Sequence, residues 1–259
     1  VTLEEGKEKV VSYLAPEEYV IPGIGNWFAS TCQQCPSGCG VHGRVREGRV
    51  LKLEGNPDSL NGNGLCMMGQ ASLQAHYNPD RITQPMARKG GSLAPISWEE
   101  AWKLLQEKAG NVGAGRSAWV TGTVSGHHRV LLDALNKAWG SKDHYVYEAI
   151  NNAVGEAVNK EVLGEAMPAH HLDKAKSILS FGADFLGTWV SPVHFAKQYA
   201  DFRSGDRGVL IQIEPKMSLT GATADMWVAA RPGTEGVVAL GIANVLLTKH
   251  QVNGNALPK

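Results

Sequence analysis

The chain has 259 residues, and its 25 Lys and Arg balance its 25 Asp and Glu, so the formal net charge is zero. This balance excludes the basic field of a nucleic-acid-binding protein and the polybasic face of a lipid-binding one. A hydrophobic content of 43% indicates a globular chain of one large domain or two modest ones. The longest apolar stretch, residues 237–247, is too short to span a bilayer, and no targeting signal is visible after Val1.

All four cysteines lie in the first quarter of the chain, with the spacing C-x2-C-x3-C and a distant fourth: Cys32, Cys35, Cys39 and Cys66. Two disulfides are a poor explanation, because the chain is neither small nor evenly cross-linked. Structural zinc usually takes two C-x2-C knuckles, and the second knuckle is missing here. A triplet with one remote cysteine is typical of a [4Fe–4S] cluster. The spacing therefore favours a cluster, with zinc and disulfides as the alternatives.

Between the triplet and the fourth cysteine, the pattern predicts a small antiparallel ribbon. Residues Val41–Arg46 and Arg49–Glu54 are strand-like, and the acidic residue and glycine of Glu47-Gly48 form a hairpin signal. Turn-forming residues then bring the chain back towards Cys66. We expect the metal to order this ribbon.

From Pro95 onward, strand and helix patterns alternate. Ser97 and Glu100 form a capping box that opens a helix to about Ala109. Further helices are predicted at 127–139, 193–203 and 234–248, and strands at 118–121, 145–147, 178–181, 209–213 and 226–230. Such alternation implies a parallel sheet covered on both faces, with ligands bound at the carboxyl ends of its strands. The loops expected at that rim begin at Gly122, Gly182, Glu214 and Arg231.

Several of these segments resemble the amino-terminal part of the molybdopterin oxidoreductase superfamily. The resemblance is carried by "TCQQCPSGCG", "EGNPD" and "YNPDR" around the cysteines, and by "ILSFGADFLGTW" and "VLIQIEPKMSLTGATADMWVAARPGTEG" in the second half. It covers about residues 27–250 but only the front portion of the longer family members. Within the superfamily the sequence is most similar to the iron–sulfur subunit of alternative complex III.

The resemblance implies an α/β protein in which a small β-ribbon [4Fe–4S] subdomain precedes a Rossmann-like parallel domain. The expected boundaries are 1–27 for an amino-terminal arm, 28–92 for the cluster subdomain and 93–259 for the α/β domain. The implied cofactor is a [4Fe–4S] cluster held by the four cysteines. The implied role is electron transfer or scaffolding in a membrane-attached, quinol-oxidising respiratory complex.

The resemblance also implies partners and a location. The partners would be a quinol-site membrane subunit and haem c subunits, and the chain itself would neither span the membrane nor bind nucleic acid. It would lie on the periplasmic side of the cytoplasmic membrane, and we expect the arm to lie along a partner.

Three departures from the family pattern predict that no molybdopterin site is completed. The region where the family ligates molybdenum has no cysteine, and Glu148 stands there in a position typical of a surface or capping residue. Met68 occupies a place that is often basic, and Glu235 one that is commonly Asp. The alternatives are a fragment of a catalytic, polysulfide-reductase-like subunit and a non-redox zinc or scaffold module.

Overall fold

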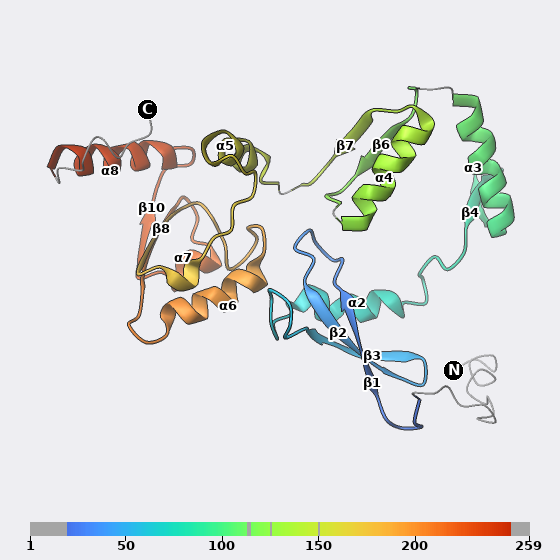
Figure 1. Cartoon of the computed structure of the whole chain (residues 1–259), viewed down its shortest axis with the longest axis horizontal. Coiled ribbons are helices and arrows are strands. Elements are labelled where there is room, and N and C mark those ends of the chain that lie inside the picture. Colours follow the sequence, from blue (N-terminus) through green and yellow to red (C-terminus); the bar gives the residue numbers. More distant parts are fainter. Residues whose placement is uncertain (1–19, 113–114, 125, 150, 250–259) are drawn as a thin grey trace. The chain divides into compact units, whose positions relative to one another are not determined.

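The computed structural model describes residues 20–112, 115–124, 126–149 and 151–249 (Figure 1). The chain divides into two compact units, Val1–Pro79 and Asp80–Lys259. Most of the predicted arm, residues 1–19, lies outside the described residues. Within the described ranges, no helix combines the length and the apolar character needed to cross a membrane.

The first unit is built on an antiparallel sheet in the order β1-β2-β3. Its strands are β1 (Asn26–Thr31), β2 (Gly40–Arg46) and β3 (Arg49–Gly55). The predicted ribbon is confirmed, and its turn residues Glu47 and Gly48 both have positive φ, 51° and 75°. Such a turn matches the right-handed twist of paired strands. Helix α2 (Met67–His76) then packs against β3.

The second unit opens with a hairpin of β4 (Met86–Lys89) and β5 (Ser92–Pro95), joined through two glycines. Helix α3 (Trp98–Val112) follows. The predicted capping box is confirmed, because the Ser97 amide donates to Glu100 Oε2 (2.9 Å) and the Glu100 amide donates to Ser97 Oγ (3.1 Å). The remaining helices of this unit, within the described residues, are α4 (Gly126–Trp139), α5 (Ala153–Leu163), the 3₁₀ turn η1 (Leu172–Lys174), α6 (Pro192–Arg203), α7 (Leu219–Thr223) and α8 (Glu235–Lys249).

Parallel strands confirm the predicted α/β class, but they form two sheets where the alternation predicts one. The larger sheet has the order β10-β9-β8, from β8 (Ser177–Phe181), β9 (Val209–Glu214) and β10 (Met226–Ala229). The smaller sheet pairs β6 (Ala118–Thr121) with β7 (Asp143–Val146). Strand patterns specify which residues are extended, whereas the choice of neighbouring strand depends on tertiary packing.

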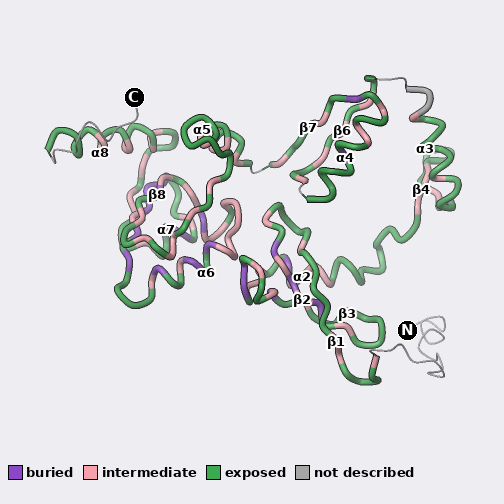
Figure 2. Tube along the Cα trace, in the orientation of Figure 1, coloured by how far each residue is buried: buried purple, intermediate pink, exposed green. Residues whose placement is uncertain are grey.

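The main core of the second unit lies between α6 and the larger sheet. Phe185, Phe195, Phe202 and Leu210 form a buried cluster. In Figure 2, the buried positions around the larger sheet and α6 are coloured purple. Aromatic rings fill much of this space, with the Phe185 and Phe195 rings edge to face at 6.4 Å between centroids. Burial of this kind is the principal stabilising contribution in an ordinary domain.

Candidate metal centre

The first three cysteines lie on the connection between β1 and β2. This connection is closed at its base, because Thr31 pairs with Gly40 across the two strands and the Cys32 amide donates to the Cys39 carbonyl at 2.8 Å. Gly38 lies within the loop with φ of 58°, a left-handed conformation that glycine adopts without a steric penalty. The local fold therefore closes the C-x2-C-x3-C segment into a tight loop.

Cys66 enters this unit as the N-cap residue of α2. The Gln70 amide donates to its carbonyl at 3.0 Å, which fixes the first turn of the helix. Gly69 is needed in that turn, because a Cβ there would collide with the side chain of Leu65. The backbone that carries Cys66 is thus part of a regular, closely packed element.

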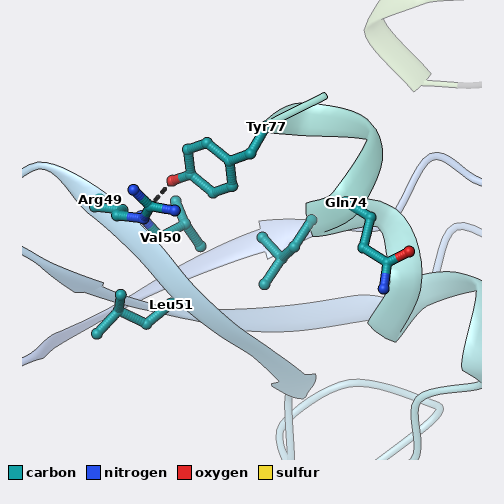
Figure 3. A pocket seen from close by; sticks show the side chains of 6 residues that line it. Arg49, Val50, Leu51, Gln74 and Tyr77 are labelled. Atoms are coloured by element: carbon teal, nitrogen blue, oxygen red, sulfur yellow. Dashed lines mark hydrogen bonds between the residues drawn. The ribbon is translucent and has the colours of Figure 1, made fainter. Parts of the chain in front are cut away.

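The C-terminal end of α2 contacts β3 through Tyr77. The Val50 amide donates to the Tyr77 hydroxyl at 2.7 Å, and the guanidinium of Arg49 lies 4.7 Å from the centre of the Tyr77 ring. Figure 3 shows these residues around a shallow hollow, together with Leu51 and Gln74. No cysteine lines this hollow. Its residues hold α2, and with it Cys66, against the sheet.

The charges of the other three cysteines reach the Cys39 thiol. Burial raises the pKa of the Cys39 thiol, and the charges of Cys35, Cys32 and Cys66 raise it further. Cys39 is buried, Cys32 and Cys66 are partly exposed, Cys35 is exposed, and all four are free thiols. Thiolates gathered in this way repel one another, and bound iron relieves that repulsion.

The donor set fits a [4Fe–4S] cluster, which takes four thiolates. Among the residues that the structure describes, no group of three or more His, Cys, Asp or Glu side chains is arranged to hold a metal ion. A cubane differs from a single ion, since each thiolate binds a different iron atom. Assignment of the four cysteines as ligands therefore stays a prediction, based on their spacing in the sequence and on the charge effects of three of them on Cys39.

The side chain of Glu148 is engaged within its own unit. Its Oε1 accepts a hydrogen bond from the Thr123 amide at 2.6 Å, across the ends of β6 and β7. It also lies beside Gly122, where a Cβ would come within 3.1 Å of it. Glu148 therefore caps the loop after β6, as its position in the sequence predicts.

The predicted rim of the larger sheet is likewise filled by the chain itself. Asp184, after β8, accepts a hydrogen bond from the Thr220 hydroxyl at 2.9 Å. Glu214, at the end of β9, is buried and accepts from the Ser218 amide (2.7 Å) and from the Gln212 side chain (3.0 Å). These two carboxylates hold the rim loops in place.

One buried residue near the cysteines belongs to no sequence motif. Asn61 has only 4% of its surface exposed, and its side chain contacts both cysteine-bearing segments. In the sequence it stands among turn-forming residues, and no periodic signal distinguishes it from Asn56 or Asn63. Such a role becomes visible only once the loop is folded.

Fold and site together define an α/β protein with an amino-terminal iron–sulfur-type unit. Residues 26–78 match the molybdopterin oxidoreductase Fe4S4 domain, and residues 81–257 match the molybdopterin oxidoreductase family. The second match covers more than half of the chain. The chain belongs to the molybdopterin oxidoreductase family.

The curated relatives include subunits of several reductases. The molybdopterin-containing subunit of the arsenate respiratory reductase of Shewanella sp. is 31% identical over 88% of this chain and 28% of its own length. The molybdopterin-binding-like subunit of the menaquinone reductase of Nitratidesulfovibrio vulgaris is 29% identical over 88% of this chain and 34% of its own. The periplasmic nitrate reductase of Desulfovibrio desulfuricans is 28% identical over 88% of this chain and 31% of its own. The chain thus spans roughly a third of these relatives.

A solved structure supports the same fold. Acetylene hydratase from Pelobacter acetylenicus superposes with a TM-score of 0.66, covering 86% of this chain and 32% of that one. The sequence identity is 20%, so the likeness concerns the fold alone.

Proposed function

We propose that Cys32, Cys35, Cys39 and Cys66 hold a [4Fe–4S] cluster that relays single electrons. The observation that carries the proposal is the match of residues 26–78 to an Fe4S4 domain that contains all four free cysteines, with buried Cys39 within reach of the charges of the other three. When bound, the cluster accepts one electron from a donor and releases it to an acceptor. The chain's own residues hold the thiolates and limit the access of water to Cys39.

We further propose that the chain serves as the iron–sulfur or scaffold subunit of a quinol-oxidising respiratory complex without a molybdenum site. The resemblance to the iron–sulfur subunit of alternative complex III supports this assignment. A relative that is named a molybdopterin-binding-like subunit of a menaquinone reductase supports it as well. So does Glu148, whose carboxylate is engaged with the Thr123 amide. The Met68 side chain is also 57% exposed, and its thioether has no hydrogen to donate to a pterin.

A catalytic molybdopterin subunit is the second candidate, and the names of the relatives favour it. The arsenate respiratory reductase relative is named a molybdopterin-containing subunit. In this second candidate the cluster would deliver electrons to a molybdenum centre completed by residues outside the present sequence. A zinc-bearing or purely scaffolding module is the third candidate.

We propose the periplasmic side of the cytoplasmic membrane as the location, with attachment through a quinol-site membrane subunit and haem c subunits. Support comes from the relative named periplasmic nitrate reductase and from the resemblance to alternative complex III. Nucleic acid is not an expected partner of a chain with zero net charge.

Metal analysis of the protein purified anaerobically with its partners tests these candidates. We expect about four iron atoms per chain and no stoichiometric molybdenum or tungsten. About one molybdenum per chain would replace the first candidate with the catalytic one. Zinc without iron would replace both with the third.

A further inference from the structure

The two cysteine-bearing segments are joined by one buried amide. Asn61 lies in the loop between β3 and α2, with 4% of its surface exposed. Gly40, which directly follows Cys39, donates its amide to Asn61 Oδ1 at 2.9 Å. Asn61 Nδ2 donates to the Gly40 carbonyl at 3.0 Å and to the Gly64 carbonyl, two residues before Cys66, at 2.7 Å.

These contacts define the orientation of the Asn61 side-chain amide and use its hydrogen-bonding capacity fully. An N–H faces the oxygen of the side chain, and carbonyl groups face its nitrogen, which matches the acceptor and donor ends of asparagine. The Asn61 side chain therefore binds both the N–H and the carbonyl group of Gly40. The backbone amide of Gly64 also donates to the Asn61 carbonyl at 3.1 Å, so the same residue holds Gly64 from two sides.

Two glycines near this amide lie too close to neighbouring atoms to carry a side chain. A Cβ on Gly40 would lie 2.6 Å from the Cβ of Ser59, and the Ser59 hydroxyl is in hydrogen-bond contact with Asn61 Oδ1. Gly55 is equally confined, because a Cβ there would collide with the Gly64 carbonyl. Close packing of this kind restricts the conformations that the loop between β3 and α2 can adopt.

We infer that Asn61 is a positioning residue that sets the separation of the Cys39 and Cys66 thiolates, and thereby decides whether the cluster retains its fourth iron. The inference rests on the proposed [4Fe–4S] site. Along the chain, Cys39 and Cys66 are separated by the whole ribbon. The Asn61 side chain connects their neighbours Gly40 and Gly64 directly, through hydrogen bonds. Loss of those bonds frees Cys66 to move away from the triplet.

Two substitutions separate the amide's donors from its acceptor. Asn61→Ala removes all of the bonds, whereas Asn61→Asp keeps an acceptor for the Gly40 amide but places a carboxylate oxygen against the Gly40 and Gly64 carbonyls. Asn63→Ala is the matched control, since Asn63 is exposed in the same loop and its side chain forms no hydrogen bond with the described part of the chain. Both Asn61 variants should behave alike, because both lose the donated bonds.

The first readout is the type of cluster in the soluble, folded fraction. Iron and sulfide counts and the electron paramagnetic resonance spectrum distinguish a four-iron cluster from a three-iron one. We expect the Asn61 variants to hold mainly the three-iron form and Asn63→Ala to hold the four-iron form. A role in stability alone would lower the melting temperature but leave the four-iron spectrum of the folded fraction intact, and that result would overturn the inference.

The second readout is the reactivity of Cys66 in the cluster-loaded protein. Iodoacetamide should alkylate the Cys66 thiol about tenfold faster in the Asn61 variants than in Asn63→Ala, as measured by peptide mass spectrometry and as expected for the loss of two buried hydrogen bonds. Equal rates would overturn the positioning role. If the unsubstituted protein binds no cluster at all, the proposed function fails, whereas a cluster that forms and does not respond to Asn61 overturns this inference alone.

A milder variant covers the case in which neither Asn61 variant is soluble. Ser59→Ala removes the hydroxyl beside the amide and leaves the amide itself. A partial shift towards the three-iron form supports the inference, and an unchanged four-iron spectrum with an unchanged rate of Cys66 alkylation overturns it.

Discussion

The two units of the chain are stabilised by different means. Among residues 20–79, the buried hydrophobic side chains are Cys39 and Val41, and the buried polar one is Asn61. The second unit contains an aromatic core of Phe185, Phe195 and Phe202 with Leu210. The small unit therefore depends on hydrogen bonds, glycine turns and metal binding, whereas the large one depends on buried apolar surface. A unit without an apolar core should lose its order when its metal is removed.

The largest expected effect is that of removing the cluster. In small metal-organised domains, the metal supplies about 10 kcal/mol or more of the folding free energy. We expect anaerobic chelation of iron to abolish amide protection in β1–β3, and Cys66→Ser to reduce it, while protection in β8–β10 persists, as measured by hydrogen exchange. Met67→Ala is the control, because Met67 is adjacent and 81% exposed. Unchanged iron content and spectrum in Cys66→Ser would show that the four-thiolate assignment is wrong.

A substitution in the aromatic core should destabilise the second unit and leave the iron content of the first unit unchanged. Phe195 is 4% exposed, and Phe195→Ala should lower the free energy of unfolding of the second unit by about 3–5 kcal/mol, through lost burial and the cavity that remains. Leu240→Ala is the control, because Leu240 is 73% exposed. Denaturant unfolding and iron analysis check the prediction together. Loss of iron in parallel with stability would contradict the independence of the two units.

A smaller effect should appear as a pH dependence in the second unit. The Asp225 carboxylate accepts from the Leu210 amide (2.8 Å) and contacts Arg203 (2.6 Å) and Arg207 (3.0 Å). The hydrogen bond from Leu210, and then that from Arg203, lowers the pKa of Asp225. Burial alone would lower the pKa of Arg203, but its hydrogen bonds to Asp225 and Tyr199 raise it.

The sign of this pH effect follows from the lowered pKa of Asp225. The stabilisation is complete above the ordinary pKa of an aspartate and is lost as the pH falls through the lowered pKa of the folded state. Urea unfolding between neutral and acidic pH should show a steeper loss for the unsubstituted chain than for Asp225→Asn. Asp133→Asn is the control, because Asp133 forms an exposed pair with Arg129. Identical pH profiles for all three proteins would exclude this role of Asp225.

The smallest effect concerns Glu148. Glu148→Ala removes the acceptor of the Thr123 amide and should lower the stability of the second unit by about 1 kcal/mol, whereas Glu148→Gln, which keeps an acceptor oxygen, should lower it less. Iron content should stay constant in both variants. Glu161→Ala, at an exposed position on α5, is the control. A loss of bound metal in Glu148→Gln would assign this residue to a metal site instead of a loop.

Much of the fold could be predicted because its signals are local. The capping box of Ser97 and Glu100, the Glu47-Gly48 turn and the helical pattern of residues 127–139 each occupy a short window of sequence. Helix α2 carries no such pattern, so it could not be predicted in the same way. The separation of β6 and β7 from the larger sheet also depends on packing between distant segments, which no local pattern encodes.

The candidate site shows the same contrast between local sequence signals and contacts that form only on folding. Cysteine spacing predicts the four thiols as ligands, because metal ligation restricts the possible spacings. Asn61 could not be identified from the sequence, because its contacts with Gly40 and Gly64 exist only after the loop closes. The capping role of Glu148 follows a general tendency of carboxylates near strand ends, but its partner, Thr123, required the structure.

The central claim is that the four cysteines hold a redox-active [4Fe–4S] cluster. The most direct measurement is the low-temperature electron paramagnetic resonance spectrum of the protein, isolated anaerobically with its partners and then reduced with dithionite. We predict the signal of a reduced four-iron cluster that integrates to about one spin per chain and is lost in Cys66→Ser. A chain that shows no such signal, and that retains zinc or free thiols in place of iron, would contradict the claim.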